Sequence, residues 1–337
     1  ISSTAIYGSR ATAGVVMVTT KSGATVQKDQ KPTISYDGYI GWTKTARMPK
    51  FYNAEGWAHY RFMKFQDGIY NLSNNPVYRM TASDYDLAMM KDDDGVYRVT
   101  ELLNEGRNTD WVDAVTQTGL QQNHYLAING SAKGLAYNFG LGYNNEKGVY
   151  KGDEQQKVNF KGAIDAEINK YLKAGFTFNA SYSDLSQTVG DAIKEAFLMV
   201  PLFRIYDADG NYIVYPGQDT ESFGYKNGAA QSVTSTVNSL MRMQNNQNQQ
   251  NTWRLLGNAY LQFEPIKGLT FKTTYSPNYK NTRKGDYTGF INPATGSYYD
   301  PDNKYNSWAY LINRTDFSWT WDNVVNYNKR FGEDKHS

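Results

Sequence analysis

Residues 157–183 read KVNFKGAIDAEINKYLKAGFTFNASYS, and this stretch decides the fold. Apolar side chains occupy every second position of its first half, at Val158, Phe160, Ile164 and Ile168. The positions between them are polar or charged: Lys157, Asn159, Lys161, Asp165 and Glu167. After Asn169-Lys170 a second run alternates in the same way. Successive side chains of a strand point to opposite faces. The pattern therefore predicts two antiparallel strands joined by a tight turn, each with one apolar and one polar face.

The same alternation recurs along the chain and predicts roughly eight strands. Many of these runs exceed the roughly five or six residues of a typical strand in a soluble protein. The polar Asn/Gln run at 244–251 is interpreted as loop. We expect the strands at 32–45, 122–132, 135–146, 155–168, 171–186, 252–264, 268–280 and 310–331.

The links between these strands alternate in length. After the second, fourth and sixth strands the links are very short. The long links are near 46–121, 187–251 and 281–309, and the link at 147–154 is intermediate. In an up-and-down barrel every second link lies on the same side of the membrane, and outer-membrane barrels combine short periplasmic turns with long extracellular loops. The sequence therefore predicts an all-β, transmembrane antiparallel β-barrel, of which this chain supplies part.

Composition agrees with a barrel and excludes several other classes. Mean hydropathy is −0.67, which strands with one polar face produce and membrane helices do not. Aromatic residues reach 15%, with 28 Tyr and 7 Trp, the residue types of membrane interfaces. The net charge is only +2, and the basic residues form no block along the sequence, so we expect no nucleic-acid partner. There is no cysteine, and hence no disulfide framework or thiolate metal site.

Residues 3–23 read STAIYGSRATAGVVMVTTKSG, and they closely resemble the segment that ends the plug domain in the SusC/RagA family of TonB-dependent outer-membrane transporters. The family tends to have Gly-Ala-Asn where this chain has residues 11–13. Further matches are Asn108-Thr109-Asp110-Trp111, TGLQQNH at 118–124, YNFGLGY at 137–143 and YDADGNY at 206–212.

The resemblance implies a division of the chain into three parts. Residues 1–23 form the C-terminal end of the plug domain, 24–31 a linker, and 32–337 the N-terminal part of the barrel. A barrel of this family has about 22 strands, with the plug inside its lumen. Neither end of the chain reads as a natural terminus, so we expect both flanks to be missing.

The same resemblance implies a function. Such proteins sit in the outer membrane as multi-pass barrels, in contact with its lipid. They import a nutrient with energy delivered by TonB to an N-terminal segment that is absent here. A SusD-like lipoprotein lids the barrel. The expected substrate is an oligosaccharide, with a peptide as the alternative, and no cofactor is expected.

Candidate site residues fall in the plug and the long loops. Arg10 is a candidate plug–barrel contact, because a guanidinium binds a carboxylate bidentately, although it could equally cap a plug turn. A polar barrel wall would face it, formed by Lys157, Lys161, Asp165, Glu167, Lys173 and Asn179. Loop aromatics could contact substrate or the lid protein, with local packing as the alternative. They are Trp57, Tyr215, Tyr225, Tyr298 and Tyr299. Trp319, Trp321 and Tyr327 are expected in lipid-facing girdles.

Metal-binding and catalytic sites are the alternatives to these candidates. Asp92, Asp93 and Asp94 are metal candidates, since carboxylates suit Ca²⁺, with a solvated loop as the alternative. Residues 207–211 are expected to form a tight turn. His59, His124, Asp110 and Asp113 lack any accompanying nucleophile motif, so we expect no enzyme. The alternative functions are a soluble or surface carbohydrate-binding β-protein and a passive porin.

Overall fold

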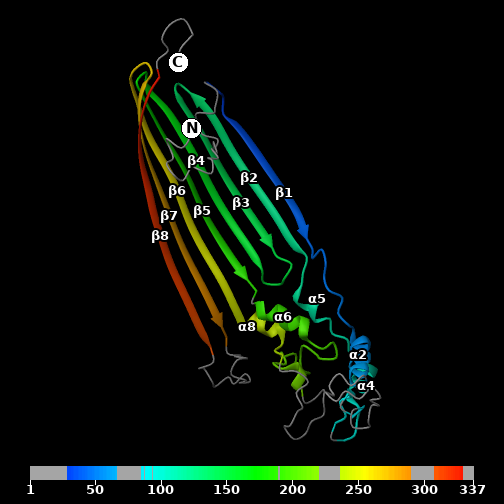
Figure 1. Cartoon of the computed structure of the whole chain (residues 1–337). Coiled ribbons are helices and arrows are strands. Elements are labelled where there is room, and N and C mark those ends of the chain that lie inside the picture. The colour runs from blue at the N-terminus through cyan, green and yellow to red at the C-terminus, as the bar shows by residue number, and fades with distance from the viewer. Residues whose placement is uncertain are drawn as a thin grey trace.

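The computed structural model describes residues 29–66, 85, 86, 88–92, 94–188, 190–219, 236–289 and 307–328. Eight antiparallel strands form one sheet in the order β1-β2-β3-β4-β5-β6-β7-β8 (Figure 1), so each strand pairs with its neighbours in sequence. The predicted up-and-down antiparallel sheet is confirmed. The sequence assigned to the end of the plug, 1–23, lies outside the described residues.

The strands and helices follow one another along the chain in a simple order. The strands are β1 Thr33–Thr43, β2 Gly119–Ala132, β3 Leu135–Lys147, β4 Glu154–Asn169, β5 Leu172–Gln187, β6 Asn246–Ile266, β7 Leu269–Thr288 and β8 Trp308–Tyr327. The helices are α2 Ala54–Gln66, α4 Arg98–Asn104, α5 Trp111–Val115, α6 Gly190–Leu198, the 3-10 helix η3 Pro216–Gln218 and α8 Ser239–Asn245.

All eight strands lie where the alternation predicts them, but β6 and β7 are longer than expected. The Asn/Gln run interpreted as loop belongs to strand β6 from Asn246 onward, and β7 continues to Thr288. The interpretation was wrong because amide side chains give no apolar alternation. The register Gln247↔Tyr287 continues the pairing of β6 with β7 through this run. The long links are consequently 44–118, 188–245 and 289–307.

The short turns are as tight as a β-hairpin allows. Lys133 and Gly134 alone join β2 to β3, and both have positive φ, 50° and 81°. A type I′ turn requires positive φ at both central positions, which explains the glycine. Lys170-Tyr171 and Lys267-Gly268 make the corresponding turns after β4 and β6. The predicted segregation of short and long links to opposite ends of the sheet is confirmed.

The register places apolar and polar residues on separate faces across the whole sheet. One row of partners is Tyr36, Leu126, Leu141, Phe160, Ala180, Leu255, Tyr279 and Phe317. The next row is Asp37, Tyr125, Gly142, Asn159, Ser181, Arg254, Lys280 and Asp316. We call the face that carries Phe160 the apolar face and the face that carries Asn159 the polar face. Because side chains alternate, the two rows point to opposite sides.

The apolar face has the height of a bilayer core. On β6 it runs from Trp253 to Phe263, which is about 34 Å along a strand that rises roughly 3.4 Å per residue. At a tilt of about 45° this is about 24 Å, close to the roughly 25 Å apolar band of outer-membrane barrels. Trp319 and Trp321 lie on this face, 56% and 63% exposed, in register with Pro277 and Tyr275 of β7.

Aromatic rings of this face also contact one another toward the long links. His124 stacks between Tyr36 and Tyr143, with ring centroids 6.1 and 6.4 Å away. Tyr182 and Trp253 lie 4.7 Å apart, and the Asn251 amide donates to the Tyr182 hydroxyl at 2.9 Å. Such residues combine an apolar ring with a polar group, which suits the boundary between an apolar band and water.

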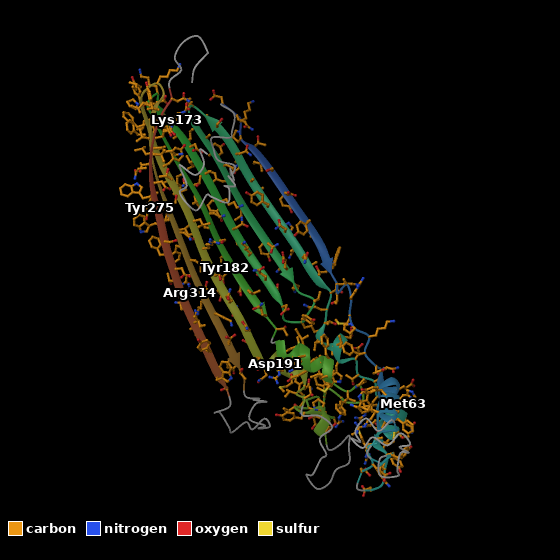
Figure 2. All side chains as sticks on the ribbon, viewed as in Figure 1. Met63, Lys173, Tyr182, Asp191, Tyr275 and Arg314 are labelled. Atoms are coloured by element: carbon orange, nitrogen blue, oxygen red, sulfur yellow. The ribbon has the colours of Figure 1, made fainter. Side chains whose placement is uncertain are left out.

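All the described helices lie beyond one end of the sheet, the end of the long links (Figure 1). Figure 2 shows Lys173 near the opposite end and Arg314 nearer the helices. Among the residues that the structure describes, no helix has the length and apolarity that a membrane crossing requires. The largest buried cluster is found among these helices rather than on the sheet.

The two faces of the sheet should respond oppositely to a new charge. We expect Phe176→Arg to destabilise the full-length protein in a bilayer by about 2–4 kcal/mol, because it places a charge near the middle of the apolar band. Thr177→Arg, one residue along on the polar face, should change the free energy of unfolding by under about 0.5 kcal/mol. Urea titration of protein refolded into lipid vesicles measures both values, and equal losses would contradict the assignment of faces.

Candidate functional site

The links 44–118 and 188–245 fold together into one helical cluster. Its core takes α2, α4 and α5 from the first link and α6 with its following residues from the second. The buried members include Ala58, Val99, Leu102, Trp111, Ala196 and Phe203. Leu202 and Val99 are fully buried. Segments far apart in sequence thus make a single packed unit, which the sequence analysis treated as separate loops.

Four consecutive residues tie this cluster together, and they are the motif Asn108-Thr109-Asp110-Trp111. The Ala54 amide at the start of α2 donates to Asn108 Oδ1 at 3.0 Å. The Thr109 amide donates to the Pro201 carbonyl at 2.7 Å, and Trp111 Nε1 donates to the Val200 carbonyl at 3.2 Å. Asp110 caps α5 by accepting from the amides of Val112 and Asp113. The motif therefore acts as a structural joint between the two links.

Half-buried ion pairs reinforce the second link. Arg242 of α8 donates through two nitrogens to Glu195 of α6, at 2.7 and 2.5 Å. Burial raises the pKa of Glu195 above its usual range, and Arg242 opposes that rise. Arg204 likewise binds Asp219 through two nitrogens, at 2.8 and 3.2 Å. Bidentate pairs fix orientation, so α6 and α8 are held in one arrangement.

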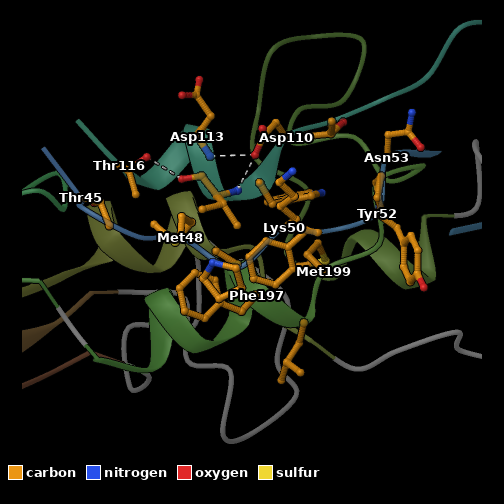
Figure 3. A pocket seen from close by; sticks show the side chains of 18 of the residues that line it. Thr45, Met48, Lys50, Tyr52, Asn53, Asp110, Asp113, Thr116, Phe197 and Met199 are labelled. Carbon is orange, nitrogen blue, oxygen red and sulfur yellow. Dashed lines mark hydrogen bonds between the residues drawn. The ribbon is translucent and has the colours of Figure 1, made fainter. Parts of the chain in front are cut away.

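A pocket of about 890 Å³ lies where the two links meet (Figure 3). One wall is the extended segment 44–53 that leaves β1, the second is 108–118, and the third is the C-terminal end of α6. The joint motif thus forms part of the wall, and the pocket lies at the long-link end of the sheet. Its volume falls within the roughly 300–1,000 Å³ of ligand sites.

The lining combines aromatic rings with charged groups. Phe51 stacks on Phe197 with ring centroids 5.3 Å apart, and Tyr52 stacks on Tyr60 at 5.6 Å. Phe51 and Tyr52 are 46% and 60% exposed, so their rings present free area to a ligand. Figure 3 labels Lys50 and Asp113 in the same lining. Exposed rings beside a cation and an anion can bind polar solutes with flat apolar faces, such as sugars or peptides.

Of the loop aromatics singled out from the sequence, Trp57 lies in this pocket and Tyr215 does not. Trp57 is half-buried against the core, with the Arg61 guanidinium 5.4 Å from its ring centroid. Tyr215 is only 7% exposed and packs with Val214, Val237 and Met241 in a second cluster. Its ring is a core element and has little surface for a ligand. Arg10, Tyr225, Tyr298 and Tyr299 lie outside the described residues.

Asp92, one of the three candidate metal ligands, accepts hydrogen bonds that stabilise a turn. Its Oδ1 accepts from the amides of Asp94 and Val96 at 3.0 and 2.8 Å, and Arg98 Nε donates to Oδ2 at 2.7 Å. Burial would raise the pKa of Asp92, but the hydrogen bonds from Val96 and Arg98 outweigh it and hold the pKa below its usual range. Asp93 is outside the described residues, and within those residues no group of carboxylate or imidazole ligands gathers to hold a metal.

The predicted turn at 207–211 is confirmed. Asp207 accepts from the amides of Asp209 and Asn211 at 3.0 and 2.8 Å, and Gly210 has a φ of 85°. These hydrogen bonds, led by the one from Asn211, lower the pKa of Asp207. The candidates for acid–base chemistry are dispersed. Asp110 is occupied as a helix cap, and His124 bonds to the Tyr36 hydroxyl on the apolar face.

The polar wall expected from the sequence shares one face, as the register requires. Lys157, Lys161, Asp165 and Asn179 all lie on the polar face. The Tyr260 hydroxyl reaches across β5 and donates to Asp165 Oδ1 at 2.7 Å. Gly175 makes this possible, because a Cβ there would lie 2.1 Å from the Tyr260 ring. The polar face thus carries charged and polar groups, some of which are bonded to one another, as Tyr260 is to Asp165 and Lys173 is to Glu167.

Sequence reasoning missed Lys50, Phe51, Tyr52 and Phe197 as pocket residues. The segment 44–53 has neither a strand nor a helix period. Phe197 belongs to the other link, 144 residues after Asn53 in the sequence, and only the tertiary packing brings the two segments together. The one available signal was the motif at 108–111, whose closeness to the pocket wall only the packing reveals.

Together the sheet and the cluster define a class of protein. The sheet is a stretch of an antiparallel barrel wall, apolar on one side and polar on the other. Beyond one rim the wall carries a packed helical unit with an open pocket. This arrangement is typical of large outer-membrane barrels with elaborated loops.

Known proteins of this class are similar to the chain. It is 27% identical over 293 residues to the TonB-dependent receptor P26 of Formosa agariphila, which covers 87% of this chain and 26% of that protein. It is 27% identical over 217 residues to the TonB-dependent receptor SusC of Bacteroides thetaiotaomicron, covering 63% of this chain and 18% of that protein. The structure of the RagAB peptide transporter matches with a TM-score of 0.66 and 17% identity, over 98% of this chain and 36% of that chain.

The resemblance predicted from the motifs is therefore confirmed. The chain is similar in sequence to TonB-dependent receptors, SusC among them, and similar in fold to RagAB. No protein-family model matches it. The chain spans 26% and 28% of the length of two of the curated relatives it matches.

The joint motif gives a direct test of the cluster. We expect Trp111→Ala to destabilise it locally by about 3–5 kcal/mol, because it removes a 3% exposed ring and its bond to Val200. Hydrogen exchange of peptides from α2 and α6 should accelerate together in the full-length protein. Trp308→Ala, at an exposed strand end, is the control and should leave both unchanged. Faster exchange in α2 alone would show that the two links are not one unit.

Proposed function

We propose that this chain forms the first part of the barrel of an outer-membrane importer that takes up a nutrient at the expense of energy delivered by TonB. The observation that carries the proposal is the separation of faces over all eight strands, with a bilayer-high apolar band on one side and a charged network on the other. Its support from known proteins is the similarity to TonB-dependent receptors.

The polar face would line the lumen and hold a plug, with Arg10 in residues 1–23 as a contact. Such a contact has to hold and then release. Pairs between exposed charges are worth only about 0–1 kcal/mol each. Lys173 and Glu167 form a pair of this kind within the wall, at 2.7 Å. A plug bound by many such bonds can be withdrawn because water replaces each bond at small net cost.

The helical cluster would stand on the extracellular side, because short turns are periplasmic in outer-membrane barrels and long links are external. A substrate arriving from outside would meet the pocket between segment 44–53 and α6. The exposed rings of Phe51 and Tyr52 and the charge of Lys50 suit an oligosaccharide, with a peptide as the alternative. A SusD-like lipoprotein would cover this side of the barrel. Trp57 would then contact the substrate or this lipoprotein.

Growth experiments test this proposal in the native host. A strain that lacks the gene should fail to grow on one or a few glycans or peptides, in a panel offered as sole carbon source. Deletion of TonB should abolish the same growth. Growth that needs the gene but persists without TonB would favour a passive porin. A protein found without detergent in the soluble fraction would favour a carbohydrate-binding protein.

The role of the pocket has its own test. Once a substrate is known, the double variant Phe51→Ala/Tyr52→Ala should reduce uptake at limiting concentration about tenfold or more, since stacked rings contribute about 1 kcal/mol or more each. Met63→Ala, exposed on α2 and outside the pocket lining (Figure 2), is the matched control. Unchanged uptake by the double variant, with normal amounts of protein in the outer membrane, would remove the pocket from the transport route.

A further inference from the structure

The apolar face does not end abruptly at the rim that carries the long links. On β6, β7 and β8 the ladder continues for several residues beyond the band. The side chains on the same side become polar on β6 and at Asn281, Arg283, Asn313 and Thr315, whereas Leu311 further along β8 is apolar. Beyond Trp253 come Asn251, Gln249 and Gln247. The register sets Arg283 beside Asn251 and Gly285 beside Gln249.

This extension has its own hydrogen-bond network. Asn281 donates to Asn313 Oδ1 and to Thr315 Oγ1, both at 2.9 Å, and so joins β7 to β8. Gln249 donates to Asp184 of β5 at 3.0 Å. Amide groups thus form a collar that follows the apolar band around the sheet. Amides both donate and accept, as sugar hydroxyls do.

A groove of about 380 Å³ lies within this collar, between β6, β7 and β8. Its lining includes Gln247, Gln249, Asn251, Arg283, Tyr287 and Leu311. Gly285 forms its floor, and a Cβ there would meet only Leu311, at 3.9 Å. Arg283 is exposed, and no ion pair joins it to another described residue. The groove thus offers a free cation, several amides and an aromatic ring immediately beyond the apolar band.

We propose that this groove binds the sugar–phosphate headgroup of a glycolipid in the outer leaflet, a lipopolysaccharide. The proposal rests on the outer-membrane placement proposed above. Arg283 would bind the phosphate, since a guanidinium matches phosphate oxygens bidentately. The amides of Gln249 and Asn251 would bind sugar hydroxyls. The acyl chains would lie along Trp253 and Tyr279, which continue the same face toward the membrane centre.

The opposite rim of the sheet has a different chemistry. There the turns of the described residues present Lys133, Lys170 and Lys267, and the Lys170 ammonium lies 4.7 Å from the Tyr171 ring centroid. Lysines at an interface suit simple anionic headgroups as point charges. The collar and its groove are therefore a feature of one rim, and this difference fits a membrane whose two leaflets carry different lipids.

The test uses the full-length protein purified in mild detergent. Lipopolysaccharide and phosphatidylglycerol are titrated separately, and bound lipid is counted by native mass spectrometry. We expect lipopolysaccharide to bind in preference. Arg283→Ala should weaken that binding about tenfold, because it removes a charge-assisted hydrogen bond. Gly285→Leu should weaken it as much by filling the groove. Arg254→Ala, on the polar face of β6, is the matched control and should bind as the unmodified protein does.

Equal binding of the two lipids, or binding unaffected by both groove variants, would overturn the proposal. So would protection of the groove by a co-purified lipoprotein in place of lipid. The readout involves no transport. Retained lipopolysaccharide binding in a protein that imports nothing would therefore contradict the proposed function and leave this inference standing.

Discussion

Backbone hydrogen bonding in a medium without water is the constraint on which the structure depends. Each unpaired N–H or C=O in a bilayer costs several kcal/mol, so a spanning sheet needs an unbroken ladder. The eight strands form a continuous sheet from β1 to β8, with register irregularities near the turns after β4 and β6 and a gap in the pairing of β6 with β7 beside Pro277. Once the strand register is fixed, the two-residue alternation of a strand determines on which face of the sheet each side chain lies. A shift of one residue between any pair would exchange the apolar and polar rows.

The end of the sheet at the long links follows from the same constraint. Outside the band, water satisfies the backbone, so the chain is free to form helices with polar caps. Asp110 and Asn238 provide such caps for α5 and α8. The helices then need a core of their own, and two links supply it jointly. The pocket lies between those links, and its wall shares the joint motif at 108–111. A site built from two links can be rigid while the barrel wall beneath it remains a simple meander.

The strands could be predicted because Val158–Ile168 and similar runs carry their own signal in sequence. The start of β6 could not, since Gln247 and Gln249 look like loop unless the partner strand β7 is known. The pocket was only partly foreseeable. Trp57 was found by residue type, Tyr215 was selected on the same ground and is buried, and Phe197 is brought to the site by tertiary packing alone. Residue type indicates what a side chain could bind, whereas packing decides whether it is exposed.

Which face of the sheet meets lipid is the central question, and the absence of cysteine from these 337 residues makes it measurable by cysteine labelling. Single cysteines would be placed along β5 at Phe176, Thr177, Phe178 and Asn179 in the full-length protein, in native outer membranes. Reaction with a membrane-impermeant maleimide and with a lipid-soluble one would then be compared. We predict that cysteines at 176 and 178 react only with the lipid-soluble reagent, whereas those at 177 and 179 react with the impermeant reagent from the lumen. Equal reaction of all four with the impermeant reagent would contradict a membrane-spanning wall.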